Sequence, residues 1–481
     1  LKDGGVQVQD RVALISENSS SFLVGFLGIL TAGAVAVPLD PQLPAAVIEE
    51  RVSQCAIPWI CISGIRPEKT FGNQTKLDPG VVILSEARGD WGSIDLKTKV
   101  LQGVEGLPIG WPTGSEQEPA VILFSSGTTG APKGVVLTHR AIITNINAIV
   151  DYMKPSSADV FYIIKTMTHT ATLTGELLTG LRVGAGLIAR NPVVPPTIIL
   201  KRIEDLKPTI VFANPTILQI LLKVKGEKFD LSSVRIVYTS GSVAGTELIE
   251  EAGAFFSKGA TTPAIVLNVY GLTEAGPRVT AQRAERGIIK PGSVGTPIQG
   301  VSLEIRNPEG EICSPHETGR IYIHTPSLML GYWGDRRSTL LKIKDGWLDT
   351  GDLGYQDEDG DVFIVGRADE VIIRGAHNID PYRIENVIRR IPGVANCLIF
   401  GIPDPVHGSR VVCAIQKESA AALDRHTMMA YCGQYLAPYE CPQMICEWPV
   451  FPTTPSGKPS RKLAMEYYLR SLKSEELKEK S

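Results

Sequence analysis

A segment rich in serine, threonine and glycine follows an apolar run in the first third of the chain. It reads SSGTTGAPKG at residues 125–134, directly after Val121–Phe124. Small residues let backbone N–H groups approach a polyphosphate, while hydroxyls donate hydrogen bonds and a lysine adds a mobile cation. The spacing is not that of a Walker loop, and a surface turn of the same composition is the alternative. We expect phosphate contacts from Ser125, Ser126, Gly127, Thr128, Thr129, Gly130 and Lys133.

Four further motifs follow this loop along the chain. They read YGLTE at residues 270–274, WLDTGDLG at 347–354, GRADEVIIRG at 366–375 and PSGKPSR at 455–461. In type and order the five motifs resemble those of the adenylate-forming superfamily, which includes acyl-CoA synthetases, firefly-type luciferases and the adenylation domains of peptide synthetases. The resemblance covers nearly the whole chain and is closest to stand-alone acyl- or aryl-CoA ligases. It implies that ATP, Mg²⁺ and coenzyme A take part in the reaction.

The reaction that this resemblance implies begins by joining two anions. A carboxylate attacks the α-phosphorus of ATP to give acyl-AMP and pyrophosphate, so positive charge must be fixed between them in the transition state. The resemblance assigns this charge to Lys458. Without the resemblance, a lysine beside Gly457 and Pro459 would be interpreted as a solvated surface residue. Transfer of the acyl group to the thiol of coenzyme A would follow.

The YGLTE motif implies the contacts to metal and phosphate. Glu274 resembles the family's Mg²⁺ ligand, since a hard cation prefers carboxylate oxygen. Thr273 would donate a hydrogen bond to the α-phosphate. The alternative is that Thr273 is an ordinary helix N-cap followed by an acidic residue in the first turn.

The resemblance also implies the contacts to adenosine. Asp352 would accept both ribose hydroxyls, and Arg367, fifteen residues later, would make a second ribose contact. An aspartate in a Gly-Asp-Leu-Gly segment is usually a turn residue, so the assignment depends on this pairing. Tyr270 would stack on the adenine, unless it is a plain core residue. The remaining adenine contacts are expected from Asn268, Gly271, Ser240, Gly241 and Ser242.

Residues 366–375 resemble the hinge about which the family's small domain rotates after adenylation. Asp369 matches the hinge position, while Arg374 and Gly375 belong to the strand-turn that would then enter the active site. The same motion would withdraw Lys458 and open a channel for the thiol. Most members have two glycines where this chain has Gly375-Ala376, which adds a methyl group where the pantetheine arm would pass.

The acyl group is expected between His169 and the turn at residues 240–243. Members that activate α-amino acids commonly place an aspartate directly after the position of His169, where this chain has Thr170. A buried ammonium group would then lack a partner, so we expect an aryl or medium-chain carboxylic acid without an α-amine. His169 could equally be a core residue whose ring is satisfied.

Three other functions stay open on the sequence. The enzyme could load an acyl or amino acid onto the phosphopantetheine arm of a carrier protein, which would be a separate chain because few residues follow Arg461. It could also oxidise the adenylate as luciferases do, although no residue requires this. A non-catalytic ATP-binding module is the third possibility, and the combined presence of Lys458, Glu274 and Asp352 argues against it.

The elements that position these motifs indicate an α/β fold. Apolar strands are expected at residues 121–124, 209–212, 234–238 and 264–269, with helices at 139–152 and 246–256 between them, so the sheets should be parallel or mixed. Closely spaced strands from about residue 292 predict a β-barrel-like subdomain. We expect a large domain at residues 1–366, a hinge at 367–369 and a small mobile α+β domain at 370–481.

Composition excludes several classes of partner. The chain has 48 Lys and Arg against 51 Asp and Glu, a formal charge of -3, so no global field attracts nucleic acid or an anionic membrane. Its eight cysteines are scattered without metal-site spacing, which favours reduced thiols and a cytoplasmic protein. Residues 22–39 are uncharged, but their glycines and Pro38 predict a buried helix, a turn at 32–33 and a strand instead of a membrane span.

Overall fold

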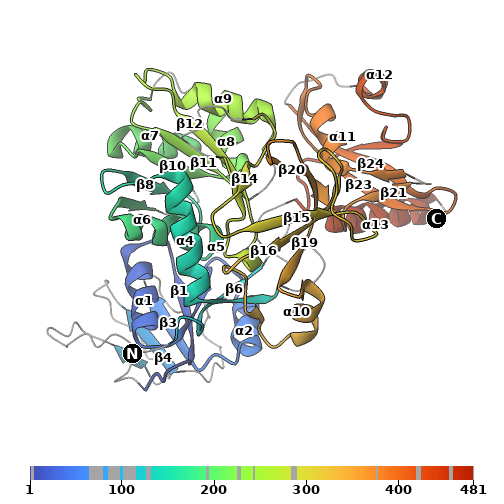
Figure 1. Cartoon of the computed structure of the whole chain (residues 1–481). Coiled ribbons are helices and arrows are strands. Elements are labelled where there is room, and N and C mark those ends of the chain that lie inside the picture. The colour runs from blue at the N-terminus through green and yellow to red at the C-terminus, as the bar shows by residue number, and fades with distance from the viewer. Residues whose placement is uncertain are drawn as a thin grey trace.

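The protein folds into four packed parts, seen in a computed structural model (Figure 1). It describes residues 1, 5–63, 80–84, 98–100, 115–125, 132–190, 194–224, 229–241, 244–282, 290–374, 377–418, 424–453 and 459–479. These residues form two mixed sheets with helices, a curled antiparallel sheet and a smaller α/β part at the C-terminal end. The predicted fold class is confirmed.

The first sheet carries the segment that leads into the phosphate loop. Most of its strands are parallel, and β7 is the antiparallel partner of β6. In spatial order its strands are β17 (Gly331–Tyr332), β7 (Gly134–Thr138), β6 (Pro119–Phe124), β2 (Val35–Leu39), β1 (Arg11–Ser16), β3 (Trp59–Ser63), β4 (Gly80–Leu84) and β5 (Thr98–Val100). Helices α1 (Ser20–Thr31) and α2 (Ala45–Gln54) follow β1 and β2 in the chain.

The second sheet contains the strand that leads into the YGLTE motif. Its order is β14 (Thr296–Pro297), β13 (Thr280–Ala281), β12 (Ile265–Tyr270), β11 (Ile236–Thr239), β10 (Ile210–Ala213), β8 (Val160–Ile163) and β9 (Gly186–Ala189). Its helical segments are α4 (His139–Met153), α5 (Thr170–Thr172), the π-helical η3 (Leu173–Leu178), α6 (Thr179–Val183), α7 (Pro196–Leu206), α8 (Pro215–Leu222), α9 (Thr246–Phe256) and the 3-10 turn η5 (Thr273–Ala275). Strands β8 to β12 are parallel, as expected for strands joined by crossover helices.

The third sheet is antiparallel and carries the TGD motif. It comprises β15 (Ser302–Arg306), β16 (Gly319–His324), β19 (Trp347–Gln356), β18 (Ile343–Lys344) and β20 (Val362–Arg367), with α10 (Arg336–Lys342) before β18. Strands β19 and β20 are antiparallel partners, which places Asp352 opposite Arg367. The predicted β-rich segment is therefore a curled sheet that brings two distant motifs together.

The C-terminal part has its own sheets and its own apolar clusters. Its elements are β21 (Ile372–Arg374), β22 (His377–Ile379), α11 (Pro381–Ile388), β23 (Val394–Asp404), β24 (Gly408–Lys417), α12 (Arg425–Tyr435), β25 (Met444–Glu447) and α13 (Arg461–Glu479). Two clusters of buried apolar residues draw only on residues from Ile372 onward. The boundary at residue 366 and the hinge at 367–369 stay predictions.

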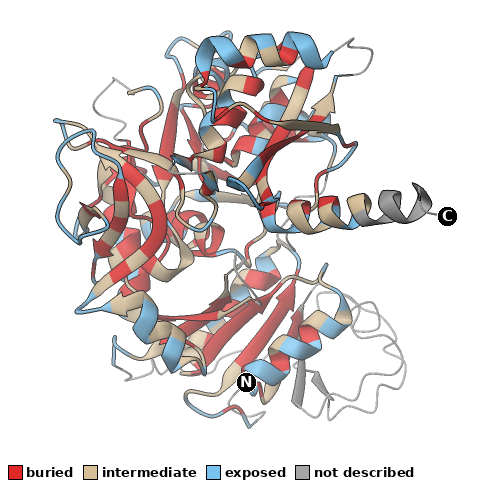
Figure 2. Ribbon diagram, turned by 90° about the vertical axis from the view of Figure 1, so that its right-hand side faces the viewer, coloured by how far each residue is buried: buried red, intermediate tan, exposed pale blue. Residues whose placement is uncertain are grey.

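The apolar stretch at residues 22–39 folds as the sequence predicts. Ser19 caps α1 by accepting a hydrogen bond from the backbone N–H of Phe22 (3.2 Å), a turn follows at 32–33, and β2 begins at Val35. Phe22 and Phe26 are fully buried, as are the residues of β2. Strands of the large sheets are mostly buried, whereas the helices around them also carry exposed residues (Figure 2). In the described part of the chain, no helix has the length and apolar character that crossing a membrane requires.

Candidate active site

The phosphate loop is the connection of a β-hairpin. Phe124 at the end of β6 faces Gly134 at the start of β7, and the backbone N–H of Ser125 donates to the carbonyl of Lys133 (3.0 Å). The ammonium group of Lys133 donates to the hydroxyl of Ser338 (2.5 Å) and lies 3.5 Å from a carboxylate oxygen of Asp335. Ser126, Gly127, Thr128, Thr129 and Gly130 lie outside the described residues.

Tyr332 connects the loop lysine with the candidate metal ligand. Its ring centroid lies 4.9 Å from the ammonium nitrogen of Lys133, and its hydroxyl donates to Oε1 of Glu274 (2.9 Å). Burial raises the pKa of Tyr332, and the nearby Glu274 adds to this shift, so the phenol keeps the proton that it donates. Tyr332 belongs to none of the sequence motifs, and the analysis of the sequence missed it.

The surroundings of Glu274 fit a magnesium ion held mainly by phosphates and water. The described residues contain no group of three or more His, Cys, Asp and Glu side chains that could hold a metal by itself. A site of this kind suits Mg²⁺, which usually binds through one or two carboxylates together with substrate phosphates. The N-cap interpretation of Thr273 is wrong, because Leu272 precedes η5 and no side chain caps this turn.

Asp352 lies between two hydrogen-bond donors. The Tyr270 hydroxyl donates to its Oδ2 (2.5 Å) and the Arg367 guanidinium to its Oδ1 (3.1 Å). Asp352 is 7% exposed, and burial raises its pKa although Arg367 opposes this shift. Arg367 also donates to Asp369 (3.1 Å), so the two ribose candidates and the candidate hinge residue share one hydrogen-bond chain. Tyr270 is half-buried at the end of β12 and is not a fully enclosed core residue.

The residues expected around the adenine lie at the ends of β11 and β12. Ser240 is buried and Gly241 is exposed with φ at +99°, while Ser242 lies outside the described residues. Asn268 is 1% exposed, and its side-chain amide donates to the carbonyl of Ser293 (3.0 Å). A Cβ at Gly271 would lie 1.8 Å from the carbonyl oxygen of Pro277, so only glycine fits there.

Comparison with known proteins assigns this arrangement to a family. Residues 1–333 match the AMP-binding enzyme family, and residues 383–458 match the AMP-binding enzyme C-terminal domain. The chain belongs to the AMP-binding enzyme family. It is an adenylate-forming ligase, as the five motifs predict.

Curated relatives and solved structures match the ligase over nearly its whole length. It is 29% identical to an oxalate–CoA ligase of Arabidopsis thaliana over 98% of this chain and 90% of the relative. It is 28% identical to a long-chain-fatty-acid–CoA ligase of Bacillus subtilis over 97% and 87% of the two chains. The ATP-bound crystal structure of MatB from Rhodopseudomonas palustris is 26% identical and superposes with a TM-score of 0.85, covering 97% of this chain and 90% of that one.

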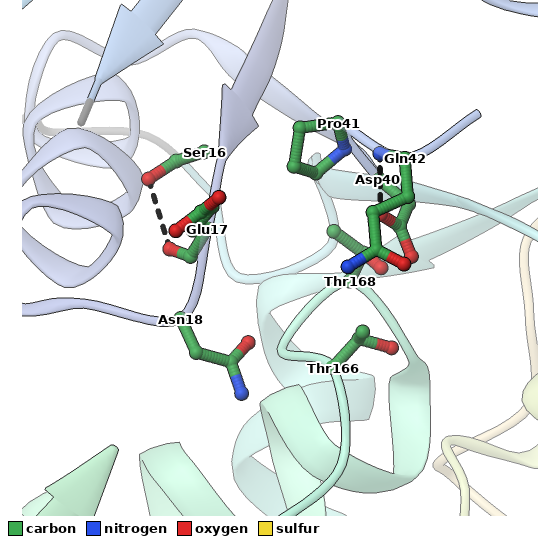
Figure 3. Close-up of a pocket in the computed structure, with 8 residues that line it drawn as sticks. All are labelled: Ser16, Glu17, Asn18, Asp40, Pro41, Gln42, Thr166 and Thr168. Carbon is green, nitrogen blue, oxygen red and sulfur yellow. Dashed lines mark hydrogen bonds between the residues drawn. The ribbon is translucent and has the colours of Figure 1, made fainter. Parts of the chain in front are cut away.

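His169 lies on the surface of the ligase, beside the start of α5. It is exposed, so the interpretation of a core histidine is wrong. Asn18 ties the segment before it to β1: its side chain donates to the carbonyl of Lys165 (2.8 Å) and accepts from the backbone N–H of Met167 (2.9 Å). A small pocket lies here and is lined by Ser16, Glu17, Asn18, Asp40, Pro41, Gln42, Thr166 and Thr168 (Figure 3). No sequence motif includes Asn18.

Arg461 anchors the last motif to the small α/β part. Its guanidinium donates to Glu385 (2.7 Å) and Glu370 (3.0 Å) and lies 3.9 Å above the ring of Tyr382. Thr453 and Pro459, which flank residues 454–458, form an isolated β-bridge. Lys458 falls within that segment and lies outside the described residues.

The residues on either side of the predicted turn after the hinge contact the small α/β part. Arg374 donates to the carbonyl of Tyr439 (2.9 Å), and the ring of His377 stacks on the ring of Tyr439 at 3.9 Å. Ile373 is 61% exposed. Gly375 and Ala376 lie outside the described residues.

Proposed function

We propose that this ligase joins a carboxylic acid to coenzyme A in two steps. In the first step a carboxylate oxygen bonds to the α-phosphorus of ATP, the bond to the β-phosphate oxygen breaks, and pyrophosphate leaves. In the second step the sulfur of coenzyme A bonds to the acyl carbon and AMP leaves. Two sets of contacts carry the proposal. Tyr332 contacts both Lys133 and Glu274. Tyr270 and Arg367 both donate hydrogen bonds to Asp352.

Each of these side chains has a role that its chemistry supports. Lys133 binds the β- and γ-phosphates, and Glu274 holds Mg²⁺, which neutralises charge on the departing pyrophosphate. Thr273 donates to the α-phosphate. Asp352 accepts the ribose hydroxyls, while Arg367 keeps the Asp352 carboxylate oriented. Lys458 places its charge between the carboxylate and the α-phosphate.

The small α/β part serves both steps in this proposal. Residues 367–369 act as the hinge, with Asp369 held to Arg367 before the rotation. Rotation removes Lys458 and brings the turn after Arg374 to the acyl-AMP. In the present arrangement Arg374 and His377, which flank that turn, both contact Tyr439 of the small α/β part, which supports assigning this arrangement to the first step.

The relatives are named for oxalate and for long-chain fatty acids, which differ widely in polarity, so their names do not select one acid. A carrier protein is the alternative thiol donor. A cytoplasmic location is consistent with eight free cysteines, because burial raises the pKa of all eight thiols and so disfavours the reactive thiolate.

Substitution of Lys458 tests the proposal. We expect Lys458→Ala to lower acid-dependent exchange of pyrophosphate into ATP by about 100-fold or more, since it removes the charge between two anions. Lys462→Ala is the matched control, because Lys462 is exposed on α13 four residues later and should leave the rate unchanged. Wild-type exchange in Lys458→Ala would refute the assigned role.

Product analysis separates the competing functions. Exchange followed by formation of an acyl-CoA thioester supports the proposal. Exchange without thioester formation from coenzyme A would support a carrier protein as acceptor. No exchange with any acid would support a non-catalytic module.

A further inference from the structure

Two buried charged side chains and one half-buried lysine lie together between the His169 segment and the end of the second sheet. Lys165 follows β8, Glu176 belongs to η3 and Arg278 follows η5. The ammonium nitrogen of Lys165 lies 2.5 Å from Oε1 of Glu176. Glu176 is 0% exposed and Arg278 is 2% exposed. We call these three residues the buried charge cluster.

The buried charge cluster carries one positive charge more than its partners neutralise. It has two basic groups and one carboxyl, and moving a proton from Lys165 to Glu176 leaves the sum unchanged. Tyr238 and Tyr152 also contact the cluster, but burial raises the pKa of both phenols, so they stay neutral. Among the residues that the structure describes, no carboxylate forms an ion pair with Arg278, and the carboxyl of Glu176 is already paired with Lys165. The guanidinium therefore lacks a counter-ion of its own.

The groups that accept hydrogen bonds from the Arg278 guanidinium are neutral, so they do not neutralise its positive charge. Its Nε donates to the Tyr238 hydroxyl (2.5 Å) and its Nη2 to the carbonyl of Ala171 (3.3 Å). A Cβ at Gly175 would lie 2.8 Å from Nη2, so the glycine makes room for the guanidinium beside η3. An isolated buried charge is costly, and a carboxylate that reaches it offsets this cost through charge-assisted hydrogen bonds.

The cluster borders both segments between which the sequence predicts the acyl group, namely the His169 segment and the turn at residues 240–243. Ala171 is two residues after His169, and Lys165 donates to the hydroxyl of Ser240 (3.4 Å), where the opposite turn begins. Buried hydroxyls without a hydrogen-bond partner in the described part of the chain lie in the same segments, at Thr172, Thr174 and Thr239. Unpaired buried donors beside an unneutralised cation are typical of a site completed by its ligand.

We propose that Arg278 receives a second anionic group of the acid, so that the preferred substrate is a dicarboxylic acid activated at one end. This inference rests on the proposed function and narrows the expectation of an aryl or medium-chain acid without an α-amine. An apolar acyl end leaves the buried charge without a counter-ion, whereas a distal carboxylate pairs with the guanidinium. A substrate ammonium group is disfavoured at the same place, because Lys165 and Arg278 repel it.

Matched pairs of acids test the inference on the wild-type ligase. Each pair has equal carbon number and differs by a terminal methyl or carboxylate: butyrate and succinate, hexanoate and adipate, 4-methylbenzoate and terephthalate. We expect kcat/KM for pyrophosphate exchange to be about tenfold or more higher for the dicarboxylate in the pair whose length fits. Equal or higher values for the uncharged member of every pair would overturn the inference. No exchange with any of the six would instead count against the proposed function.

Substitution of Arg278 gives the second test. Arg278→Gln should lower kcat/KM for the preferred dicarboxylate by about tenfold or more and leave its uncharged partner within about threefold, whereas a purely structural role would lower both equally. Arg278→Lys keeps a positive charge and should restore part of the ratio of kcat/KM between the dicarboxylate and its uncharged partner. This variant replaces Arg278→Gln in the test if the glutamine variant does not fold. Arg235→Gln is the control, because Arg235 pairs with Asp159 at the other end of β11 and should leave the ratio unchanged. An unchanged ratio in a folded Arg278→Gln variant would overturn the assignment.

Discussion

At the scale of single residues, the carboxylate of Asp352 shows how a charged group is kept ready for a ligand. Tyr270 and Arg367 each donate to one of its oxygens, from the end of β12 and from β20. Burial raises the pKa of Asp352, and the positive charge of Arg367 lowers it again. The pairing therefore keeps an acceptor available where a buried carboxyl alone would tend to hold its proton.

Asp352→Asn tests this role. An amide keeps the size of the side chain but replaces one acceptor oxygen with a donor, so it cannot accept both ribose hydroxyls. We expect the KM for ATP to rise by about tenfold or more, with the KM for the acid nearly unchanged. Initial rates at varied ATP concentration measure the effect.

Asp345→Asn provides the matched control for that substitution. Asp345 is exposed, and its φ of +50° is one that asparagine tolerates. The Asp345→Asn variant should have the same KM for ATP as the wild type. If Asp352→Asn also left the KM for ATP unchanged, the ribose contact would have to come from another residue.

At the scale of elements, two helices of the small α/β part begin with aspartate caps in opposite environments. Asp380 precedes α11 and accepts hydrogen bonds from the backbone N–H groups of Tyr382 (2.9 Å) and Arg383 (3.2 Å). Burial nevertheless raises the pKa of Asp380 to about 6. Asp424 precedes α12, and hydrogen bonds from Thr427 lower its pKa.

The raised pKa of Asp380 predicts how stability depends on pH. Between about pH 4 and pH 6 the folded state binds a proton at Asp380 that the unfolded state has released, so the free energy of unfolding falls as pH rises through this window. Asp380→Asn should flatten this fall while keeping the cap, as denaturant unfolding at several pH values would measure.

Asp424 at α12 is the control, because its pKa is shifted in the opposite direction to that of Asp380. Asp424 has a lowered pKa, so its contribution to stability is present above the usual aspartate range and is lost as pH falls through its folded pKa. Asp424→Asn should therefore lower the free energy of unfolding by a constant amount between about pH 4 and 6, and it should change the pH dependence only below about pH 4. Identical pH profiles for Asp380→Asn and the wild type would contradict the prediction for α11.

At the scale of the whole molecule, an ion pair connects the small α/β part to the second sheet's helices. Arg390, just after α11, lies 2.6 Å from the carboxylate of Glu247 in the first turn of α9. Both side chains are more than half exposed, so the pair adds little to overall stability. It forms only in an arrangement that brings these two helices together, and we assign that arrangement to the adenylation step.

Arg390→Glu tests this assignment. The substitution replaces an attraction with a repulsion, so we expect pyrophosphate exchange to fall by about threefold while thioester formation from supplied acyl-AMP is unchanged or faster. The charge swap Arg390→Glu with Glu247→Arg should restore the wild-type balance. Equal effects on both half-reactions, or none, would mean that this contact does not select between arrangements.

The sequence by itself determined the family, the fold class and most elements of the large sheets. Apolar runs with glycine and proline at their ends define local structure, as in residues 22–39, where helix, turn and strand follow as predicted. The pairing of Asp352 with Arg367 was also predictable, because a recognised motif order links them, and β19 and β20 make them neighbours.

Only the tertiary structure decided which side chains from unconnected segments meet. Tyr332 connects Lys133 with Glu274, and Arg278 joins Lys165 and Glu176, although no motif or periodicity relates these positions. Such contacts depend on how the crossover helices place strands side by side. Burial, which sets the charge of a carboxyl or guanidinium, likewise depends on the packed surroundings and not on neighbours in the sequence.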